Sequence, residues 1–300
     1  MNVLYAIGHT PLLDLTYLFD GHNSIKIYAK AEYLNPSGSV KDRAAKAIFL
    51  ESIESKKLTR AKSLLDATSG NTGIAYAMIG AALGYKVTLC LPKNASDGRK
   101  QVLRAYDAHI IETDPLLSSD GAQLEAKKLS ELYPDLYFYS DQYNNEANWK
   151  AHYETTALEI WTQTNQKITH FVAGMGTSGT FMGTSRRLKE LNPSLKAVAV
   201  QPDSPFHGLE GMKHMSSTIL PGIYDATLIN ETIEVETEEA MKMTLRLARE
   251  MGIFVGISSG ANVLATLELA KRLPGNSVVV TILCDSGFRY LSESLWRESL

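Results

Sequence analysis

Lys41 stands at the first turn of a predicted helix, just after the Pro-Ser-Gly-Ser turn of residues 36–39. The partial positive charge of a helix N-terminus opposes an ammonium group, so a lysine there favours the neutral amine. A neutral lysine amine is the form that makes a Schiff base with a carbonyl compound. The plainer interpretation is a surface lysine that shares a charged helix face with Asp42 and Arg43. Other polar turns decide between the two.

A glycine-rich turn, GMGTSGTFMG at residues 174–183, joins a predicted strand to a predicted helix. Free backbone N–H groups at such a helix start favour an anion. The turn matches the dinucleotide pattern G-x-G-x-x-G, but the acid that would hold a ribose is displaced to Asp203, behind a proline. The hydroxyls of Thr177, Ser178 and Thr180 favour a terminal phosphate over a dinucleotide or a plain tight turn.

A second polar turn, ATSGNTGIAYA at residues 67–77, also connects a strand to a helix. Glycines let a ligand approach the backbone, and hydroxyl and amide groups supply donors. The alternative is a simple helix N-cap, for which Ser69 or Asn71 alone would suffice. The turn is richer in donors than a cap requires, so it predicts a carboxylate-binding site made from Thr68, Ser69, Gly70, Asn71 and Thr72.

The stretch GISSGANV, residues 256–263, matches the nucleophile elbow G-x-S-x-G of hydrolases. That hydrolase order requires a histidine downstream of the serine, whereas the last histidine of the chain is His214. Ser258 is therefore interpreted as a neutral hydrogen-bonding residue at a helix start. No C-x-x-C or H-E-x-x-H pattern occurs, so the sequence predicts no metal site.

One kind of ligand explains a lysine at a helix start, a phosphate site, a carboxylate site and a neutral hydroxyl. It is a cofactor that carries an aldehyde and a phosphate. Lys41 is accordingly a candidate anchor for pyridoxal phosphate.

Strands and helices alternate along most of the chain, and the strands are apolar throughout. This pattern is typical of parallel sheets covered on both faces, here two of them with a change near residues 144–149. The expected strands are 24–33, 63–68, 85–92, 108–113, 136–143, 168–174, 195–202 and 277–285. The expected helices are 41–58, 73–84, 98–106, 125–133, 151–164, 181–191, 238–252 and 262–273.

Composition narrows the classes of function. The chain has 300 residues, 44% hydrophobic, and a net charge of −3, which gives no reason to expect nucleic acid or an acidic membrane surface as a partner. Cys90 and Cys284 lie in apolar runs, as buried thiols of a reducing compartment do. With no signal-peptide pattern and no long apolar run, we expect a cytoplasmic protein.

Four motifs in this order, NPSGSVKDR, TSGNTG, GMGTSGT and GISSG, resemble the cysteine synthase (O-acetylserine sulfhydrylase) family. The resemblance covers nearly the whole chain and is greatest to the B-type enzymes. It implies the two-lobed α/β fold of the fold type II pyridoxal-phosphate enzymes, similar to the tryptophan synthase β chain. It also implies a small mobile lobe over residues 36–147, and a large phosphate-binding lobe over 1–35 and 148–300.

The resemblance implies a role for each site residue. Lys41 binds pyridoxal phosphate as a Schiff base and later moves the α-proton. Asn71 contacts the ring oxygen, and Ser258 contacts the ring nitrogen. The phosphate is held by Gly176, Thr177, Ser178, Gly179 and Thr180. The substrate carboxylate is held by Thr68, Ser69, Asn71, Thr72 and Gln142.

The implied reaction makes L-cysteine from O-acetylserine or O-phosphoserine and sulfide, through an α-aminoacrylate. Lys213 and His214 lie where a cation would suit the phosphorylated donor. The chain departs from the family pattern at Glu146, where proline is usual, and at Ser178, where glycine is frequent. A further departure is Asp97-Gly98, where an acidic–basic pair is common.

Alternatives within the fold are a cystathionine β-synthase, which condenses serine with homocysteine, and a serine or threonine dehydratase. A catalytically silent peptide-binding protein is a third, which the intact Lys41 opposes. The resemblance also implies a homodimer, and it raises the C-terminal peptide of serine acetyltransferase as a partner for the carboxylate site.

Overall fold

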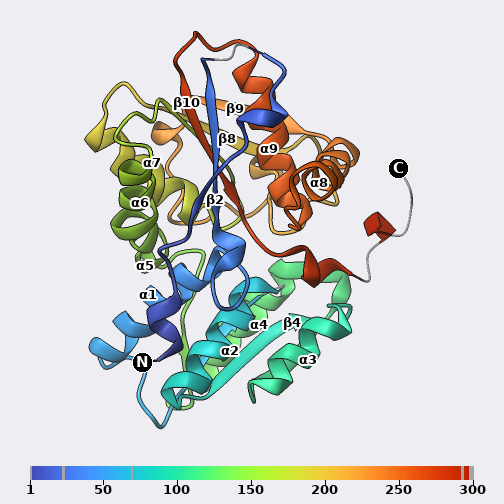
Figure 1. Cartoon of the computed structure of the whole chain (residues 1–300). Coiled ribbons are helices and arrows are strands. Elements are labelled where there is room, and N and C mark those ends of the chain that lie inside the picture. The colour runs from blue at the N-terminus through green and yellow to red at the C-terminus, as the bar shows by residue number, and fades with distance from the viewer. Residues whose placement is uncertain (1, 22–23, 69, 292–293, 297–300) are drawn as a thin grey trace. The chain divides into compact units, whose positions relative to one another are not determined.

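The computed structural model describes residues 2–21, 24–68, 70–291 and 294–296 (Figure 1). The chain forms two compact units. The smaller contains the chain up to Ile7, Asn35–Ser37 and Lys41–Asn148. The larger contains Gly8–Leu34, Gly38–Val40 and the chain from Trp149 onward.

The smaller unit is built on a parallel sheet of four strands in the order β5-β4-β3-β6. Its two central strands are buried on both faces and carry mostly apolar side chains, as a sheet covered on both sides requires. The strands are β3 (Ser63–Ala67), β4 (Val87–Pro92), β5 (His109–Thr113) and β6 (Tyr137–Tyr139).

Helices cover the two faces of this sheet. Leu64 and Leu89 pack in one core with α1 and α2, whereas Leu65 and Cys90 pack in another with α4. Gly84 ends α2 in a left-handed conformation, φ +69°, which glycine adopts without steric cost. The helices are α1 (Lys41–Glu54), α2 (Asn71–Leu83), α3 (Asp97–Ala105) and α4 (Ser118–Leu132).

The larger unit is built on a sheet of six strands in the order β1-β2-β10-β7-β8-β9. Only β1 is antiparallel to its neighbour, and every other pair is parallel. The strands are β1 (Leu12–Asp14), β2 (Lys26–Ala31), β7 (His170–Gly174), β8 (Lys196–Pro202), β9 (Glu231–Val235) and β10 (Val278–Leu283).

Successive residues of these strands face different helices. Val172 and Val279 pack with α8 and α9, and Phe171 and Val280 pack with α6 and α7. Figure 1 shows the two helix pairs on opposite sides of β2 and β10. The helices are α6 (Ala157–Gln163), α7 (Gly179–Leu191), α8 (Thr237–Met251) and α9 (Ile257–Ala270). Before them, α5 (Glu146–Ala151) continues into a π-helical stretch (His152–Thr156).

The structure confirms the predicted α/β fold with mostly parallel sheets and differs in detail. The first residues were expected in the large lobe, but Leu4 and Ile7 lie in the core of the smaller unit. The single helix expected over 151–164 begins earlier, at Glu146, and is interrupted by the π-helical stretch. The short strands β1 and β9 were not predicted, because they lie at sheet edges and lack an apolar run.

In the described part of the chain, no helix is both long enough and apolar enough to cross a membrane. Among the same residues, no group of three or more His, Cys, Asp or Glu side chains is arranged to hold a metal ion.

Candidate functional site

Lys41 is the first residue of α1 and is half-buried. The carboxylate of Asp42 is fully buried and accepts hydrogen bonds from the Ser37 backbone N–H, at 2.7 Å, and from the Ser37 hydroxyl. These bonds fix the preceding turn against the helix start. Asp42 and Arg43 are both buried, at 0% and 3% exposure, so they do not form a charged surface face. The surface interpretation of this helix start is therefore wrong.

The backbone that leads into Lys41 is fixed within the larger unit. The Val40 N–H donates to the Cys284 carbonyl, at 2.8 Å, and the Cys284 N–H donates to the Ser259 hydroxyl oxygen, also at 2.8 Å. The residue before Lys41 and the residue after Ser258 are thus both tied to Cys284, which follows β10.

Ser258 lies in the first turn of α9 and is buried. The Gly256 N–H before it donates to the Asp285 carbonyl at 3.0 Å. A Cβ on Gly256 would lie 2.3 Å from Asp285 Oδ1, so a side chain there would collide. The Tyr290 hydroxyl in turn donates to Asp285 Oδ2 at 2.5 Å. The close fit of Gly256 against Asp285 sets the position of Ser258.

The turn after β3 carries the predicted carboxylate-binding residues. The Thr68 hydroxyl oxygen accepts hydrogen bonds from the N–H groups of Gly70 and Gly73, both at 3.1 Å. Among the described residues, Thr68 therefore keeps its hydroxyl proton for another acceptor. Asn71 begins α2 and is partly exposed. Ser69, also predicted here, lies outside the described residues.

Gln142, far along the chain, joins this turn. Its Oε1 accepts a hydrogen bond from the Thr72 hydroxyl, and its Nε2 donates to the Ala67 carbonyl, each at 2.8 Å. Gln142 is 4% exposed. The structure therefore brings together the two chain segments that the sequence assigned to one carboxylate site.

The glycine-rich turn after β7 contains two residues with unusual packing or backbone conformation, Gly176 and Ser178. A Cβ on Gly176 would lie 2.1 Å from the Gly211 carbonyl oxygen, so only glycine fits. Ser178 precedes α7 in the left-handed conformation, φ +67°. Its hydroxyl is buried and finds no hydrogen-bond partner among the described residues. With the free N–H groups of the helix start, this hydroxyl is a ready donor to a phosphate.

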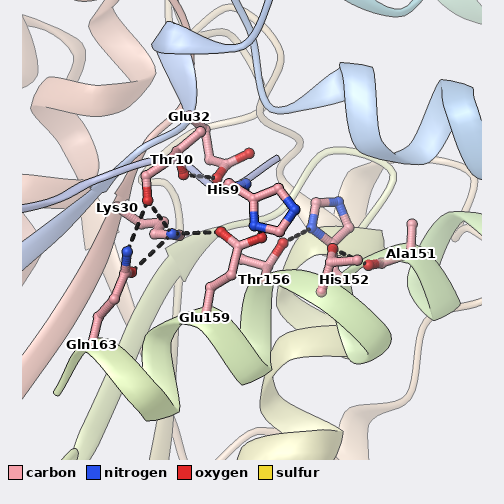
Figure 2. Close-up of polar contacts among 10 residues, drawn as sticks. His9, Thr10, Lys30, Glu32, Ala151, His152, Thr156, Glu159 and Gln163 are labelled. Atoms are coloured by element: carbon pink, nitrogen blue, oxygen red, sulfur yellow. Dashed lines mark hydrogen bonds and ion pairs between the residues drawn. The ribbon is translucent and has the colours of Figure 1, made fainter. Parts of the chain in front are cut away.

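Thr180, the last residue predicted for this turn, is held by a histidine that sequence reasoning missed. His152 is 1% exposed. Its Nε2 lies 3.2 Å from the Thr180 hydroxyl oxygen. Its Nδ1 lies 2.9 Å from the hydroxyl oxygen of Thr156 (Figure 2). Because π-helical stretches often occur at functional sites, the one that begins at His152 was a signal that only a structure reveals.

Asn262 on α9 braces the same turn and was also missed. Its Oδ1 accepts a hydrogen bond from the Gly174 N–H at 2.8 Å, and its Nδ2 donates to the Ile282 carbonyl at 2.9 Å. Asn262 is fully buried on a helix rich in apolar residues. A side-chain amide within this apolar helix could have identified Asn262 from the sequence, because a buried polar group requires hydrogen-bond partners.

Lys213 lies beside the glycine-rich turn. Its backbone N–H donates to the Met175 carbonyl at 2.8 Å, and its ammonium donates to the Thr218 hydroxyl at 3.0 Å. Its neighbour His214 bonds to the Ser217 hydroxyl instead, at 2.8 Å from Nδ1.

Known proteins match this chain along its length. The family model of the pyridoxal-phosphate dependent enzymes matches residues 3–285. A cysteine synthase of Aquifex aeolicus is 48% identical, over 99% of this chain and 92% of its own length. Cysteine synthase B of Salmonella typhimurium is 41% identical, over 99% of this chain and 97% of its own. The solved structure of a cysteine synthase from Entamoeba histolytica is 34% identical with a TM-score of 0.95, over 100% of this chain and 91% of its own.

Proposed function

This chain belongs to the family of the pyridoxal-phosphate-dependent enzymes and has cysteine synthase activity, and we propose how its residues divide the work. The resemblance read from the sequence and the relatives that match over the full length agree on this activity. The cystathionine β-synthase and dehydratase alternatives are not favoured.

The glycine-rich turn carries this assignment. Gly176 packs so closely against the Gly211 carbonyl that a Cβ would collide, which fixes the path of the turn, and the buried Ser178 hydroxyl has no acceptor among the described residues. A phosphate group supplies acceptors for that hydroxyl and for the N–H groups that open α7. We assign Gly176, Thr177, Ser178, Gly179 and Thr180 to the phosphate of the cofactor.

Lys41 and Ser258 are assigned to the reactive end of the cofactor. When bound, pyridoxal phosphate draws electrons from the substrate α-carbon, which acidifies its proton and lets the β-substituent leave. The Lys41 amine would hold the cofactor and would also accept the substrate α-proton. The Ser258 hydroxyl would bond the ring nitrogen without a full charge, and Asn71 would bond the ring oxygen.

The turn after β3 and Gln142 are assigned to the substrate carboxylate. Thr68 has a hydroxyl proton to donate, and the Thr72 hydroxyl, which donates to Gln142 Oε1, orients the Gln142 amide, whose second N–H can meet an anion. Preorganised donors bind an anion without the cost of ordering them first. Ser69 and Asn71 complete the set.

The amino-acid donor is O-acetylserine or O-phosphoserine, and sulfide is the nucleophile. Lys213 is fixed to the phosphate-binding turn by its backbone and carries the cation that a phosphorylated donor would need. Replacement of Lys213 by alanine should weaken the use of O-phosphoserine and spare that of O-acetylserine. An equal loss of activity with both donors would show that Lys213 does not select between them.

Three further assignments complete the proposal. The enzyme works in the cytoplasm as a homodimer. Residues 36–147 form a small lobe that closes on the substrate. The carboxylate-binding residues also accept the C-terminal carboxylate of a serine acetyltransferase peptide, which fluorescence titration with such a peptide would detect.

Cysteine formation from each donor with sulfide is the direct assay. We expect activity in the intact protein and none in the Lys41→Ala variant. Lys86→Ala, which removes an exposed lysine of the same unit, serves as the matched control. An active Lys41→Ala variant would refute the role of Lys41.

A further inference from the structure

Asp66 is a carboxylate in the core of the smaller unit that the proposed reaction does not use. It is the penultimate residue of β3, pairs in register with Leu89 of β4, and is 0% exposed. Burying a carboxylate costs free energy of folding unless it is hydrogen-bonded, so the hydrogen-bond partners of Asp66 indicate its role.

The two oxygens of Asp66 bind the two chain segments that form the carboxylate site. Oδ1 accepts a hydrogen bond from the Ala67 N–H at 2.7 Å, directly before Thr68. Oδ2 accepts one from the Ser140 hydroxyl at 2.6 Å, two residues before Gln142. Residues 74 positions apart are thereby joined by one side chain.

Further hydrogen bonds, made by Gln142 and Asn145, join or brace the same two chain segments. Gln142 donates to the Ala67 carbonyl and accepts from Thr72, each at 2.8 Å. The Asn145 side chain donates to the Ser140 carbonyl at 2.9 Å. Movement of Ala67 or Ser140 would therefore shift the groups assigned to the substrate carboxylate.

We propose that Asp66 is a positioning residue for the substrate carboxylate, and that its ionised form is the one that holds Thr72 and Gln142 in place. This inference rests on the proposed function of these residues. As a carboxylate, Asp66 accepts both bonds at full strength, because bonds to a charged acceptor are stronger than neutral ones.

Protonation would change the bond to Ser140. A protonated Asp66 donates from one oxygen, so the Ser140 hydroxyl must turn its own proton elsewhere. The Leu65 carbonyl is the other acceptor that Ser140 reaches, at 3.3 Å rather than 2.6 Å. The Asp66 proton is then donated to the Ser140 oxygen, so a neutral bond replaces the charge-assisted one that held the segment carrying Gln142, and substrate affinity falls.

The groups around Asp66 bring its protonation close to neutral pH. Burial raises the pKa of Asp66 to about 7, and nearby Asp141 adds to that rise. Tyr76 of α2 also interacts with the carboxyl. Further groups around it are Cys90 of β4, Tyr139 of β6 and Tyr143 after β6. Beyond these lie Asp120 and Glu125 of α4.

The Asp66→Asn variant tests this by imitating the protonated form. We expect KM for O-acetylserine to rise about 5-fold at pH 8, the difference between a charged and a neutral hydrogen bond. KM for sulfide and kcat should stay close to those of the unaltered enzyme. The KM ratio between variant and unaltered enzyme should approach 1 at pH 6, where both carry a neutral side chain. Asp135→Asn, an exposed carboxylate of the same unit, is the control.

Several outcomes would overturn the inference. An unchanged KM in Asp66→Asn would mean that the ionised form positions nothing, and a lower KM would mean that it only repels the substrate. Ser140→Ala should also raise KM, and adding it to Asp66→Asn should bring no further rise. If Asp66→Asn fails to fold, an unchanged KM in Ser140→Ala decides against the inference. If the unaltered enzyme makes no cysteine, the proposed function fails instead.

Discussion

Ser178 combines two features that each cost stability in a folded protein. Its backbone is left-handed, φ +67°, where glycine would adopt the conformation without strain. Its hydroxyl is buried without a partner among the described residues. Both costs are explained if the hydroxyl donates to the phosphate of the bound cofactor.

Ser178→Gly should therefore separate stability from binding. We expect the cofactor-free variant to be more stable by about 0.5–1 kcal/mol, because the strain is relieved. Cofactor affinity should fall about tenfold, because a hydrogen bond to a charged acceptor contributes about 1.5–3 kcal/mol. Thermal unfolding and equilibrium dialysis measure the two effects. Ser185→Ala removes another buried hydroxyl on α7 that has no partner in the described part of the chain, and it should leave affinity unchanged. A loss of affinity in this variant too would contradict this account.

Asp66 predicts a pH effect on folding. Its pKa of about 7 in the folded protein lies above the ordinary value of 3.8, because burial disfavours the charge. Between these values the folded state binds more protons than the unfolded state, so this group's contribution to stability falls as pH rises from about 4 to 7. The loss should be on the order of a few kcal/mol.

Chemical denaturation of the unaltered protein and of Asp66→Asn, across pH 4–8, measures this contribution as a difference. We expect the variant to gain relative stability as pH rises to 7 and to hold that gain above it. A difference that does not change with pH would show that Asp66 does not titrate in this window.

At the scale of elements, β2 and α6 are joined by a buried ion pair. Lys30 on β2 is fully buried, and its ammonium lies 2.6 Å from Glu159 Oε2 (Figure 2). It also donates to Gln163 Oε1 at 2.9 Å and to the Thr10 carbonyl at 2.5 Å. These bonds fix α6 directly after the π-helical stretch that presents His152 to Thr180.

Glu159→Gln should destabilise the protein by about 3–5 kcal/mol, because it removes the carboxylate from a buried ion pair. Glu268→Gln breaks the exposed pair with Lys271 and should have little effect, since water screens such pairs. Urea denaturation of both variants compares them directly. Similar losses from the two substitutions would show that burial does not govern the Lys30 pair.

The helices, strands and turns that could be predicted are those marked by a local pattern of residue types in the sequence. The glycine-rich turn after β7 and the turn after β3 could be predicted as connections from strand to helix, because glycine and hydroxyl residues cluster there between an apolar strand and a helix. The contacts that hold them could not. Asp66 meets Ser140, and His152 meets Thr180, only after the sheets and helices have formed, and no local pattern encodes such pairings.

At the scale of the whole molecule, the chain enters Lys41 through a segment that belongs to the larger unit, Gly38–Val40, while Lys41 itself belongs to the smaller. The sequence had indicated two lobes from its length and its change of pattern near residues 144–149, but not this exchange of short segments. Each is only three residues long, Asn35–Ser37 and Gly38–Val40, and their partners are distant in sequence.

The proposed homodimer is a prediction about the assembled enzyme. Light scattering of the cofactor-loaded protein should give about twice the chain mass of 33.0 kDa. A mass of one chain at micromolar concentration would contradict the dimer without affecting the assignment of the site.

The visible absorption spectrum tests the central claim, that Lys41 binds pyridoxal phosphate for cysteine synthesis, most directly. We expect the purified protein to be yellow, to lose its resting band when O-acetylserine or O-phosphoserine is added, and to regain it when sulfide follows. Lys41→Ala should lack the resting band of the lysine-bound cofactor, whereas Lys86→Ala should keep it. A protein that stays colourless after incubation with pyridoxal phosphate, or a Lys41→Ala variant with an unchanged spectrum, would contradict the account.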